Sequence, residues 1–364
     1  MTQDQPSASV SVSSVPMLVL GAGAWGTAMA IHLARRTQPG LVGLWARSTQ
    51  QAKGLSEDRE NQRYLPGHAL PDGLTICSDL TVALKDWRQQ VAHQGRGLLV
   101  LASPISGLAD LCTSVYGVLG PAQPGEGLVW LCKGLVLQAE GDRALSWPSD
   151  LVSRGCPGWP AGALSGPSFA QEVAKGLPVA LTLASQDLTW ARQAAQDLHG
   201  QGMRVYASDD LVGVQVGGAI KNVLAIAAGV ADTMALGANA RAALITRGLA
   251  EAARLGQAMG ADPETFLGLA TLGDLVLTAT GDLSRNRRVG MGLAVGKTLD
   301  EVLAELGHVA EGVATAPAIA ALGERLQVEL PITQAVCRLL AGQTTARQAM
   351  AELLTRDPTD EVRP

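Results

Sequence analysis

One lysine stands inside a helical segment that is otherwise apolar. Lys221 is the charged residue of segment 217–226, and Asn222 follows it directly. Burial disfavours the ammonium form and lowers the pKa of a lysine toward neutrality, where it can donate and accept protons. The amide of Asn222 can hold a carbonyl or a hydroxyl group. The pattern predicts an acid–base site, and the alternative is a lysine that extends from the helix edge into water.

Three further residues could belong to the same site. Lys133 follows an apolar strand at residues 128–131, at the edge where open α/β sheets bind ligands, although a solvated lysine is the alternative there. Asp274 and Thr278 are one helical turn apart and share a helix face. A carboxylate among apolar neighbours needs a partner. A lysine across a cleft is one candidate, and a helix-capping role for Asp274 is the alternative.

A candidate anion site lies at residues 281–288. Ser284 is predicted to cap a helix N-terminus, with Arg285 and Asn286 in the first turn. Backbone N–H groups, a hydroxyl and a guanidinium converge at such a place, and together they fit a phosphate. A solvated basic helix face is the alternative.

A glycine fingerprint, Gly21-x-Gly23-x-x-Gly26, lies between an expected strand and an expected helix. Gly21 allows the tight turn, Gly23 lets the backbone approach a pyrophosphate, and Gly26 lets helix and strand pack closely. The helix N-terminus then offers N–H groups and a positive dipole end to the phosphates. The fingerprint predicts dinucleotide binding, and a purely structural turn is the alternative.

The end of the second strand bears on the choice of dinucleotide. An acid about 20 residues after the fingerprint would bind the ribose 2′-hydroxyl of NAD. Here Arg47 stands at that place, and the nearest acids are Glu57 and Asp58. Arg47 could meet a 2′-phosphate, so NADPH is favoured over NADH, with a solvated arginine as the alternative.

The elements that must position these residues form two successive parts. Strands are predicted at residues 17–20, 41–46, 98–102, 128–131, 163–164, 179–184 and 203–206, interleaved with helices such as 108–118 and 188–198. This alternation predicts a parallel-rich sheet with right-handed crossovers. Long helices then follow, at residues 211–231, 239–259, 318–326 and 346–354, the last capped by Thr345. We therefore predict a disordered tail at 1–15, a sheet domain at 16–208 and an all-α domain at 209–364.

Composition limits the class of protein. The chain has 364 residues, 47% of them hydrophobic and 17% charged, which suffices for a core. A net charge of −5 argues against nucleic acid as a partner. Five cysteines without a C-x-x-C pair suggest a reducing compartment, and five histidines without an H-x-x-x-H pair give a metal site little support. Residues 1–15 lack Lys and Arg, so we expect no targeting signal. Apolar runs such as residues 223–231 are too short to span a bilayer, so we expect no membrane span and a cytoplasmic protein.

Several ordered motifs together resemble the bacterial type of NAD(P)-dependent glycerol-3-phosphate dehydrogenase. The resemblance runs from about residue 15 to about residue 354. The matching segments are GAGAWGTA from residue 21, WLCKG from 130, SGPSFA from 165, GGAIKN from 217, NARAALITRGL from 239, GDL from 273 and SRN from 284. Two departures are Ala24, where many relatives have serine, and Thr233, where family members often have glycine after the aspartate. Neither changes the lysine.

The resemblance implies a Rossmann-type α/β domain followed by a helical domain like that of 6-phosphogluconate dehydrogenases. It also implies reversible reduction of dihydroxyacetone phosphate to sn-glycerol 3-phosphate by NADPH, with NADH as the alternative, for glycerophospholipid synthesis. The partner is then a small-molecule substrate, and the choice between monomer and homodimer stays open.

The patterns described above and the family motifs, matched residue by residue, together assign the site. Lys221 corresponds to the proton acceptor of the oxidation direction, and Lys133 to a lysine between cofactor and substrate. The residues predicted to be catalytic are Lys221, Lys133 and Asp274. Those predicted to bind substrate are Lys133, Gly166, Ser168, Lys221, Asn222, Asp274, Thr278, Ser284, Arg285 and Asn286. Those predicted to bind the cofactor are Gly21, Gly23, Ala24, Trp25, Gly26, Arg47, Lys133, Ala170, Arg285, Val309 and Glu311.

Two other functions compete with this one. A ketopantoate or β-hydroxyacid dehydrogenase shares the two-domain plan, but it acts on a carboxylate and needs no phosphate cluster. A dinucleotide-sensing protein without catalysis is the other rival, and the polar set around Lys221 argues against it.

Overall fold

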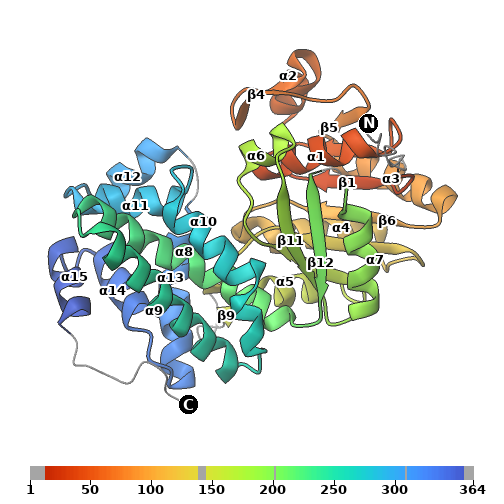
Figure 1. Cartoon of the computed structure of the whole chain (residues 1–364). Helices are drawn as coiled ribbons and strands as arrows, with labels where there is room; N and C mark the ends of the chain where they lie inside the picture. Colours follow the sequence, from red (N-terminus) through yellow and green to blue (C-terminus); the bar gives the residue numbers. More distant parts are fainter. Residues whose placement is uncertain (1–12, 138–144, 201, 308–309, 356–364) are drawn as a thin grey trace, which may run out of the picture.

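The computed structural model describes residues 13–137, 145–200, 202–307 and 310–355. A sheet covered by helices on both faces forms the N-terminal part, and a bundle of helices forms the C-terminal part (Figure 1). The last strand of the sheet ends at Ser208, and the first long helix of the bundle begins at Leu211. The α/β domain followed by an all-helical domain is therefore confirmed.

Eight strands form the main sheet, in the order β12-β11-β10-β7-β6-β1-β2-β5. All neighbouring pairs are parallel except β10 and β11, which are antiparallel. The six strands from β5 to β10 have the order 3-2-1-4-5-6, which is that of a dinucleotide-binding Rossmann sheet. The strand bounds are β1 Met17–Leu20, β2 Val42–Trp45, β5 Leu74–Cys77, β6 Gly97–Leu101, β7 Glu126–Trp130, β10 Ala161–Ser165, β11 Val179–Ala184 and β12 Met203–Ser208.

Strand β1 shows how the sheet builds two cores. Met17 and Val19 face one layer of apolar side chains, whereas Leu18 and Leu20 face the other. Such alternation follows from the two-residue period of a strand, and a strand covered on both faces is apolar throughout. The covering helices are α1 Ala24–Arg36, α2 Thr49–Asp58, α3 Leu80–Gln94, α4 Leu108–Leu119, α5 Pro148–Gly155, α6 Ala170–Lys175 and α7 Leu188–Leu198, with a short 3₁₀ turn at Ile105–Gly107.

The short and outlying strands were not predicted from the sequence. The edge strand β5 has one buried residue, Leu74, so it lacks the continuous apolar run of the central strands. Two small hairpins were missed as well, because three of their four strands have two residues and carry almost no periodic signal, and the fourth contains a proline and a glycine. They are formed by β3 Glu60–Asn61 with β4 Leu65–Ala69 and by β8 Val136–Leu137 with β9 Leu145–Ser146. Of the expected tail, Ser13 forms a bridge with Thr37, and residues 1–12 lie outside the described part.

Helix α8 is the axis of the C-terminal part. It runs over Leu211–Thr233 and has a mean hydropathy of 1.6, enough by length and composition to cross a membrane. However, 89% of that apolar window is buried inside the protein, so α8 is a core helix. The elements around it are α9 Gly237–Ala258, η2 Pro263–Leu267, η3 Leu269–Gly273, α10 Asp274–Thr280, α11 Arg285–Ala294, α12 Leu299–Leu306, α13 Glu311–Leu326, α14 Pro331–Leu340 and α15 Ala346–Leu354.

Two helices of the C-terminal part differ in how well their predicted N-termini match the structure. Thr345 caps α15 as expected, because its side chain accepts a hydrogen bond from the backbone N–H of Gln348. Helix α13, however, begins at Glu311, seven residues before the start predicted at residue 318, and it contains Pro317. Pro317 is exposed, and its missing N–H leaves the carbonyl of half-buried Val313, one turn earlier, without a helical partner.

A buried carboxylate joins α9 to α14. Glu251, on α9, is 1% exposed and accepts hydrogen bonds from the backbone N–H groups of Ile332, at 2.6 Å, and Thr333, at 3.3 Å. The hydroxyl of Thr333 lies 3.1 Å from the same carboxylate. Burial raises the pKa of Glu251 to about 7, against these hydrogen bonds, which lower it. The folded protein therefore binds this proton more tightly than the unfolded chain does.

We predict that Glu251→Gln flattens the pH dependence of stability. In the wild type the folded state holds one more proton than the unfolded state between pH 4.5 and about 7, so stability falls as pH rises through this window. Through this group, the free energy of unfolding should fall by about 3 kcal/mol as the pH rises over that range. Urea unfolding at pH 5, 6, 7 and 8 measures it. The control is Glu324→Gln, an exposed carboxylate on α13. Equal pH slopes for wild type and Glu251→Gln would contradict the assignment.

Candidate active site

The glycine fingerprint forms the turn between β1 and α1. Gly21 has φ +128°, and a Cβ there would lie 2.8 Å from the carbonyl oxygen of Ala102. A Cβ on Gly26 would overlap the carbonyl oxygen of Gly21, so helix and turn touch. A Cβ on Gly23 would meet nothing within 4 Å, and Gly23 is the N-cap of α1 without a side-chain capping bond. This open N-terminus fits a pyrophosphate, because its first N–H groups lack intrahelical partners.

Two side chains that were not predicted from the sequence hold this turn. The amide of Asn61 donates to the carbonyl of Ala22, at 3.0 Å, and to the hydroxyl of Thr27, at 2.7 Å. The amide of Gln51 donates to the same Ala22 carbonyl, at 2.7 Å. No motif signals either residue, since both reach the turn only through the fold.

The remaining residues expected near the cofactor lie around this edge. Ala24 and Trp25 are the first residues of α1, and Ala170 is the first residue of α6. Arg47 is exposed just after β2, and it makes no hydrogen bond or ion pair with any described residue. Val309 lies outside the described residues.

A buried carboxylate joins two lysines at the junction of the two parts. One oxygen of Asp274 accepts a hydrogen bond from Lys221 Nζ at 3.0 Å, and the other accepts one from Lys133 Nζ at 2.5 Å. Lys221 also donates to Thr278 Oγ1 at 2.9 Å, and this hydroxyl lies 2.6 Å from the Asp274 carbonyl oxygen. Lys221 is 8% exposed and Asp274 is 2% exposed. The predicted lysine partner of Asp274 is thus found twice: Lys133 comes from the sheet part and Lys221 from the helical part.

The charges in this cluster set one another's protonation. Burial lowers the pKa of Lys221 to about 8, although the carboxylate of Asp274 acts in the other direction. Burial alone would raise the pKa of Asp274, but the ammonium groups of Lys133 and Lys221 outweigh it and hold that pKa below its usual value. The cluster is therefore an anion between two cations, with one proton that titrates near neutral pH.

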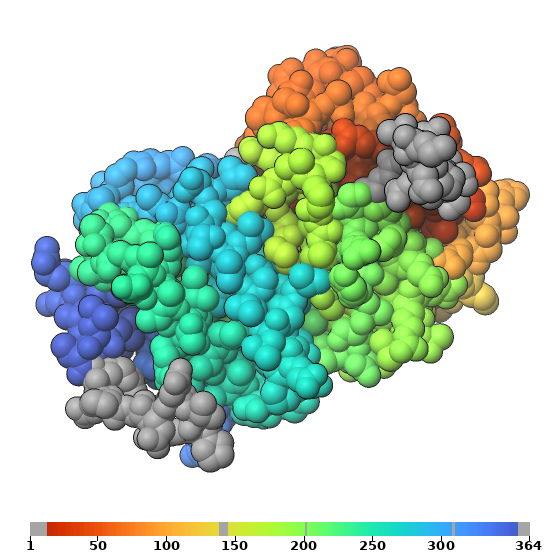
Figure 2. Space-filling view, viewed as in Figure 1, coloured from red at the N-terminus to blue at the C-terminus, as the bar shows by residue number. Residues whose placement is uncertain are grey.

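The turn after β10 reaches the same cluster. Gly166, with φ +137°, points its carbonyl oxygen at Lys133 Nζ, at 3.3 Å, and Ser168 Oγ donates to that oxygen at 3.0 Å. Lys133, Gly166 and the glycine turn all follow strand ends at one edge of the sheet. Figure 2 shows the cyan surface of the helical part, near residues 270–290, directly against the yellow-green surface of the sheet part.

Helix α11 approaches the cluster from the other side. Ser284 is its N-cap, as expected, and accepts a hydrogen bond from the Arg287 backbone N–H at 3.2 Å. Arg285 is exposed in the first turn, whereas Asn286 is buried and donates to Asn222 Oδ1 at 2.9 Å. Asn222 is 3% exposed, and its Nδ2 has no hydrogen-bond partner among the described residues. A buried amide donor without a partner, next to Lys221, fits a ligand oxygen.

Glu311 connects α13 to this network. The residue after it, Gly312, donates its backbone N–H to Asn286 Oδ1 at 3.0 Å. Burial raises the pKa of Glu311, although Arg285 and both lysines favour its charged form. Glu311, which was predicted to contact the cofactor, is thus the first residue of a helix whose next residue is hydrogen-bonded to Asn286, the partner of Asn222.

The fold and these contacts define a class of protein. A Rossmann sheet with an open glycine turn at its carboxyl edge holds a dinucleotide, and a buried lysine pair beside that edge can exchange a proton with an oxygen of a second ligand. Proteins with this combination are two-domain dehydrogenases that use a nicotinamide cofactor.

The comparisons with known proteins identify the family. Residues 16–191 match the model of the NAD-dependent glycerol-3-phosphate dehydrogenase N-terminus, and residues 210–351 match that of its C-terminus. The chain belongs to the NAD-dependent glycerol-3-phosphate dehydrogenase family. It is an oxidoreductase that interconverts dihydroxyacetone phosphate and glycerol 3-phosphate with NAD(P). The resemblance inferred from the motifs is confirmed.

Individual relatives cover nearly the whole chain. A glycerol-3-phosphate dehydrogenase [NAD(P)+] from Paucimonas lemoignei is 52% identical over 345 residues, 94% of this chain and 97% of that protein. The solved structure of glycerol-3-phosphate dehydrogenase from Coxiella burnetii is 37% identical, with a TM-score of 0.83 over 94% of this chain and 99% of that one. A ketopantoate reductase from Ralstonia eutropha JMP134 is 15% identical, with a TM-score of 0.53 over 92% and 99% of the two chains, so it shares the fold alone.

We predict that Asp274→Asn lowers the pKa of Lys221 below its wild-type value of about 8. The carboxylate stabilises the ammonium form, and losing an opposite charge at this distance shifts a pKa by about 1–3 units. Carbon-13 NMR of labelled lysine side chains, titrated from pH 4 to 11, measures the value, and Lys221→Arg assigns the signal. Asp300→Asn, an exposed carboxylate on α12, is the control. An unchanged or raised pKa in Asp274→Asn would show that burial alone sets it.

Proposed function

We propose that Lys221 is the proton donor for ketone reduction and the proton acceptor for alcohol oxidation. The observation that carries this proposal is the buried arrangement Lys133–Asp274–Lys221 beside the carboxyl edge of the dinucleotide sheet. The nicotinamide supplies the hydride that the ketone carbon receives. The protein must then stabilise the negative charge that grows on the ketone oxygen and deliver a proton to it.

Lys221 suits both tasks. An ammonium has three N–H donors. Asp274 and Thr278 occupy two of them, which leaves the third for the substrate oxygen. A preorganised charge in a water-excluded site stabilises an oxyanion far more than it would in water. With a pKa of about 8, Lys221 loses its proton readily and regains it near neutral pH.

Lys133 and Asn222 complete the contacts around the reacting group. Lys133 also donates two hydrogen bonds inside the protein, to Asp274 and to the Gly166 carbonyl, and its third N–H remains for substrate or cofactor. Asn222 adds the buried Nδ2 that has no partner among the described residues. We assign both as substrate contacts, and Asp274 and Thr278 as the groups that orient Lys221. Gly166 and Ser168 hold Lys133 from the sheet side.

The N-terminus of α11 is the proposed phosphate site. Ser284 and Arg285 bring a hydroxyl and a guanidinium to a helix start whose first turn carries no acidic residue. Asn286 donates a hydrogen bond to Asn222, the residue that follows Lys221 on α8, so this site lies beside the lysine-bearing helix. Because the phosphate is remote from the reacting carbon, its binding energy can orient the ketone against the lysine.

The proposed dinucleotide is NADPH rather than NADH. The pyrophosphate would lie at the glycine turn, and the family resemblance implies further cofactor contacts. The turn residues are Gly21, Gly23, Ala24, Trp25 and Gly26, and the further contacts are Arg47, Lys133, Ala170, Arg285, Val309 and Glu311. Arg47 supports the choice, because it is exposed at the end of β2 where an acid would select NADH. We also propose a cytoplasmic location and a role in supplying glycerol 3-phosphate for phospholipid synthesis.

We predict that Lys221→Ala folds and binds NADPH but loses at least ~10² in kcat, the contribution expected of general acid–base catalysis. The measurements are kcat with dihydroxyacetone phosphate and the dissociation constant of NADPH from fluorescence titration. Lys297→Ala, at an exposed lysine of the helical part, is the control. Turnover within about threefold of wild type would show that Lys221 is not the acid–base group.

We predict that Arg285→Ala lowers kcat/KM for dihydroxyacetone phosphate roughly ten- to a hundredfold, since a charge-assisted contact is worth about 1.5–3 kcal/mol. Most of the loss should appear in KM. Lysine at this position should restore only part of it, as it cannot bind a phosphate through two parallel hydrogen bonds. Unphosphorylated dihydroxyacetone should respond little, and so should Arg288→Ala on the same helix. An equal loss with both substrates would remove the phosphate assignment.

We predict that Arg47→Asp reverses or abolishes a preference for NADPH. A carboxylate at this position repels a 2′-phosphate and accepts a hydrogen bond from a 2′-hydroxyl. The ratio of kcat/KM for NADPH to that for NADH measures the effect, with Arg63→Asp, an exposed arginine in the β3–β4 turn, as the control. Equal use of both cofactors by the wild type would contradict the role of Arg47.

A further inference from the structure

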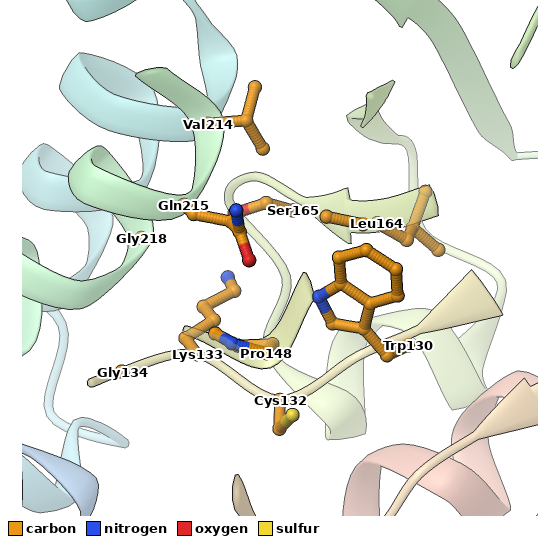
Figure 3. A pocket seen from close by; sticks show the side chains of 11 residues that line it. Trp130, Cys132, Lys133, Gly134, Pro148, Leu164, Ser165, Val214, Gln215 and Gly218 are labelled. Carbon is orange, nitrogen blue, oxygen red and sulfur yellow. The ribbon is translucent and has the colours of Figure 1, made fainter. Parts of the chain in front are cut away.

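A small cavity lies between the carboxyl edge of the sheet and helix α8. Its volume is about 10 Å³, and its walls include Trp130 from β7, Ser165 from β10, Gln215 and Gly218 from α8, and Lys133. In Figure 3 the nitrogen-bearing edge of the Trp130 indole faces the side chains of Lys133 and Gln215. The catalytic mechanism does not use Trp130, Ser165 or Gln215.

Two of the cavity walls carry buried polar atoms that lack a partner among the described residues. They are Trp130 Nε1 and Ser165 Oγ, on side chains whose residues are 2% and 5% exposed. Trp130 pairs with Ala163 on the neighbouring strand, and Ser165 is two residues further along. The period of a strand is two, so Trp130 and Ser165 lie on the same face of the sheet. Burying two such groups without partners would cost about 1–3 kcal/mol each.

Gln215 adds spare hydrogen-bonding capacity on the opposite wall. Its Oε1 accepts from the backbone N–H of Ser149 at 2.9 Å, and its Nε2 donates to Ser149 Oγ at 3.0 Å. A side-chain amide has two acceptor positions and two N–H donors, so one of each remains. The walls thus offer a donor from Trp130, a hydroxyl that can donate or accept, and an amide that can do both.

This set of partners matches one water molecule. An accessible volume of about 10–15 Å³ is the least that holds a water, which typically makes three hydrogen bonds when buried. Water can accept from the indole N–H, which no cation can do, and can donate to the oxygens of Ser165 or Gln215, which no simple anion can do. We propose that this cavity is a binding site for a single internal water molecule, held by Trp130, Ser165 and Gln215.

The position gives the water a defined place in the protein. A Cβ on Gly218 would lie 3.3 Å from Ser165 Oγ and 3.5 Å from Lys133 Cγ, so the absence of a side chain at Gly218 keeps this space open. The water joins the strand ends to α8 directly behind the stem of Lys133. The water site does not involve the substrate. The water should therefore be present whether or not Lys221 and Lys133 have the catalytic roles proposed above.

A crystal structure of the full chain at 1.5 Å or better tests the site. The expected result is one ordered water within hydrogen-bonding distance of both Trp130 Nε1 and Ser165 Oγ. Absence of density in the cavity, or a direct hydrogen bond between these two side chains, would overturn the proposal. A crystal soaked in bromide should show no anomalous signal there, because a halide at this position would mean an anion site instead.

Oxygen-17 relaxation dispersion tests the same site in solution by counting long-lived internal waters. The double variant Trp130→Phe, Ser165→Ala removes two partners of the water, so it should lose one long-lived water relative to the wild type. Trp190→Phe, on α7, is the matched control and should keep the wild-type count. An unchanged count in a folded double variant, verified by circular dichroism, would also overturn the proposal.

Discussion

The carboxylate of Asp274 is the interaction on which the site depends. Buried charges lose their hydration, and a buried lysine pair without an anion between them would repel and lose protons. One carboxylate with an oxygen toward each lysine stabilises both. Because Lys133 comes from the sheet and Lys221 from α8, the same contact also fixes the two parts of the chain to one another. Removing it would take away the charge that keeps both lysines protonated, and not only one hydrogen bond.

Small residues along α8 allow the other elements to approach it. A Cβ on Gly217 would overlap Thr271, and one on Gly229 would overlap the backbone of Arg287. A Cβ on Gly290 of α11 would in turn overlap the carbonyl of Ile226. Helices α8 and α11 therefore cross in backbone contact, and this close crossing brings Asn286 within hydrogen-bonding distance of Asn222. Helix α8 therefore carries the lysine and also provides a surface of small residues for close packing.

The two proposed anion sites use the same physical device at different places. Both α1 and α11 present an N-terminus without an acidic residue in the first turn. At α1 the cap is a glycine, so the backbone itself can approach the ligand, whereas at α11 a serine caps the helix and an arginine adds charge. The difference suits a pyrophosphate held by backbone N–H groups in one case and a terminal phosphate dianion in the other.

The sequence by itself determined the features that depend on near neighbours along the chain. The strand and glycine turn before α1, the serine cap of α11, and Asp274 one turn from Thr278 all follow from spacing within a few residues, and the central strands from their apolar runs. Ordered motifs extended this to the family. Only the tertiary structure decided which groups meet: Asp274 lies 141 residues from Lys133, and Asn61 lies 39 residues from the carbonyl it holds. The apolar surroundings of Lys221 already indicated burial and a lowered pKa. Partners at such separations arise from packing, however, so the contact of Asp274 with both lysines, the unpartnered amide of Asn222 and the support of the glycine turn could not be predicted from local pattern.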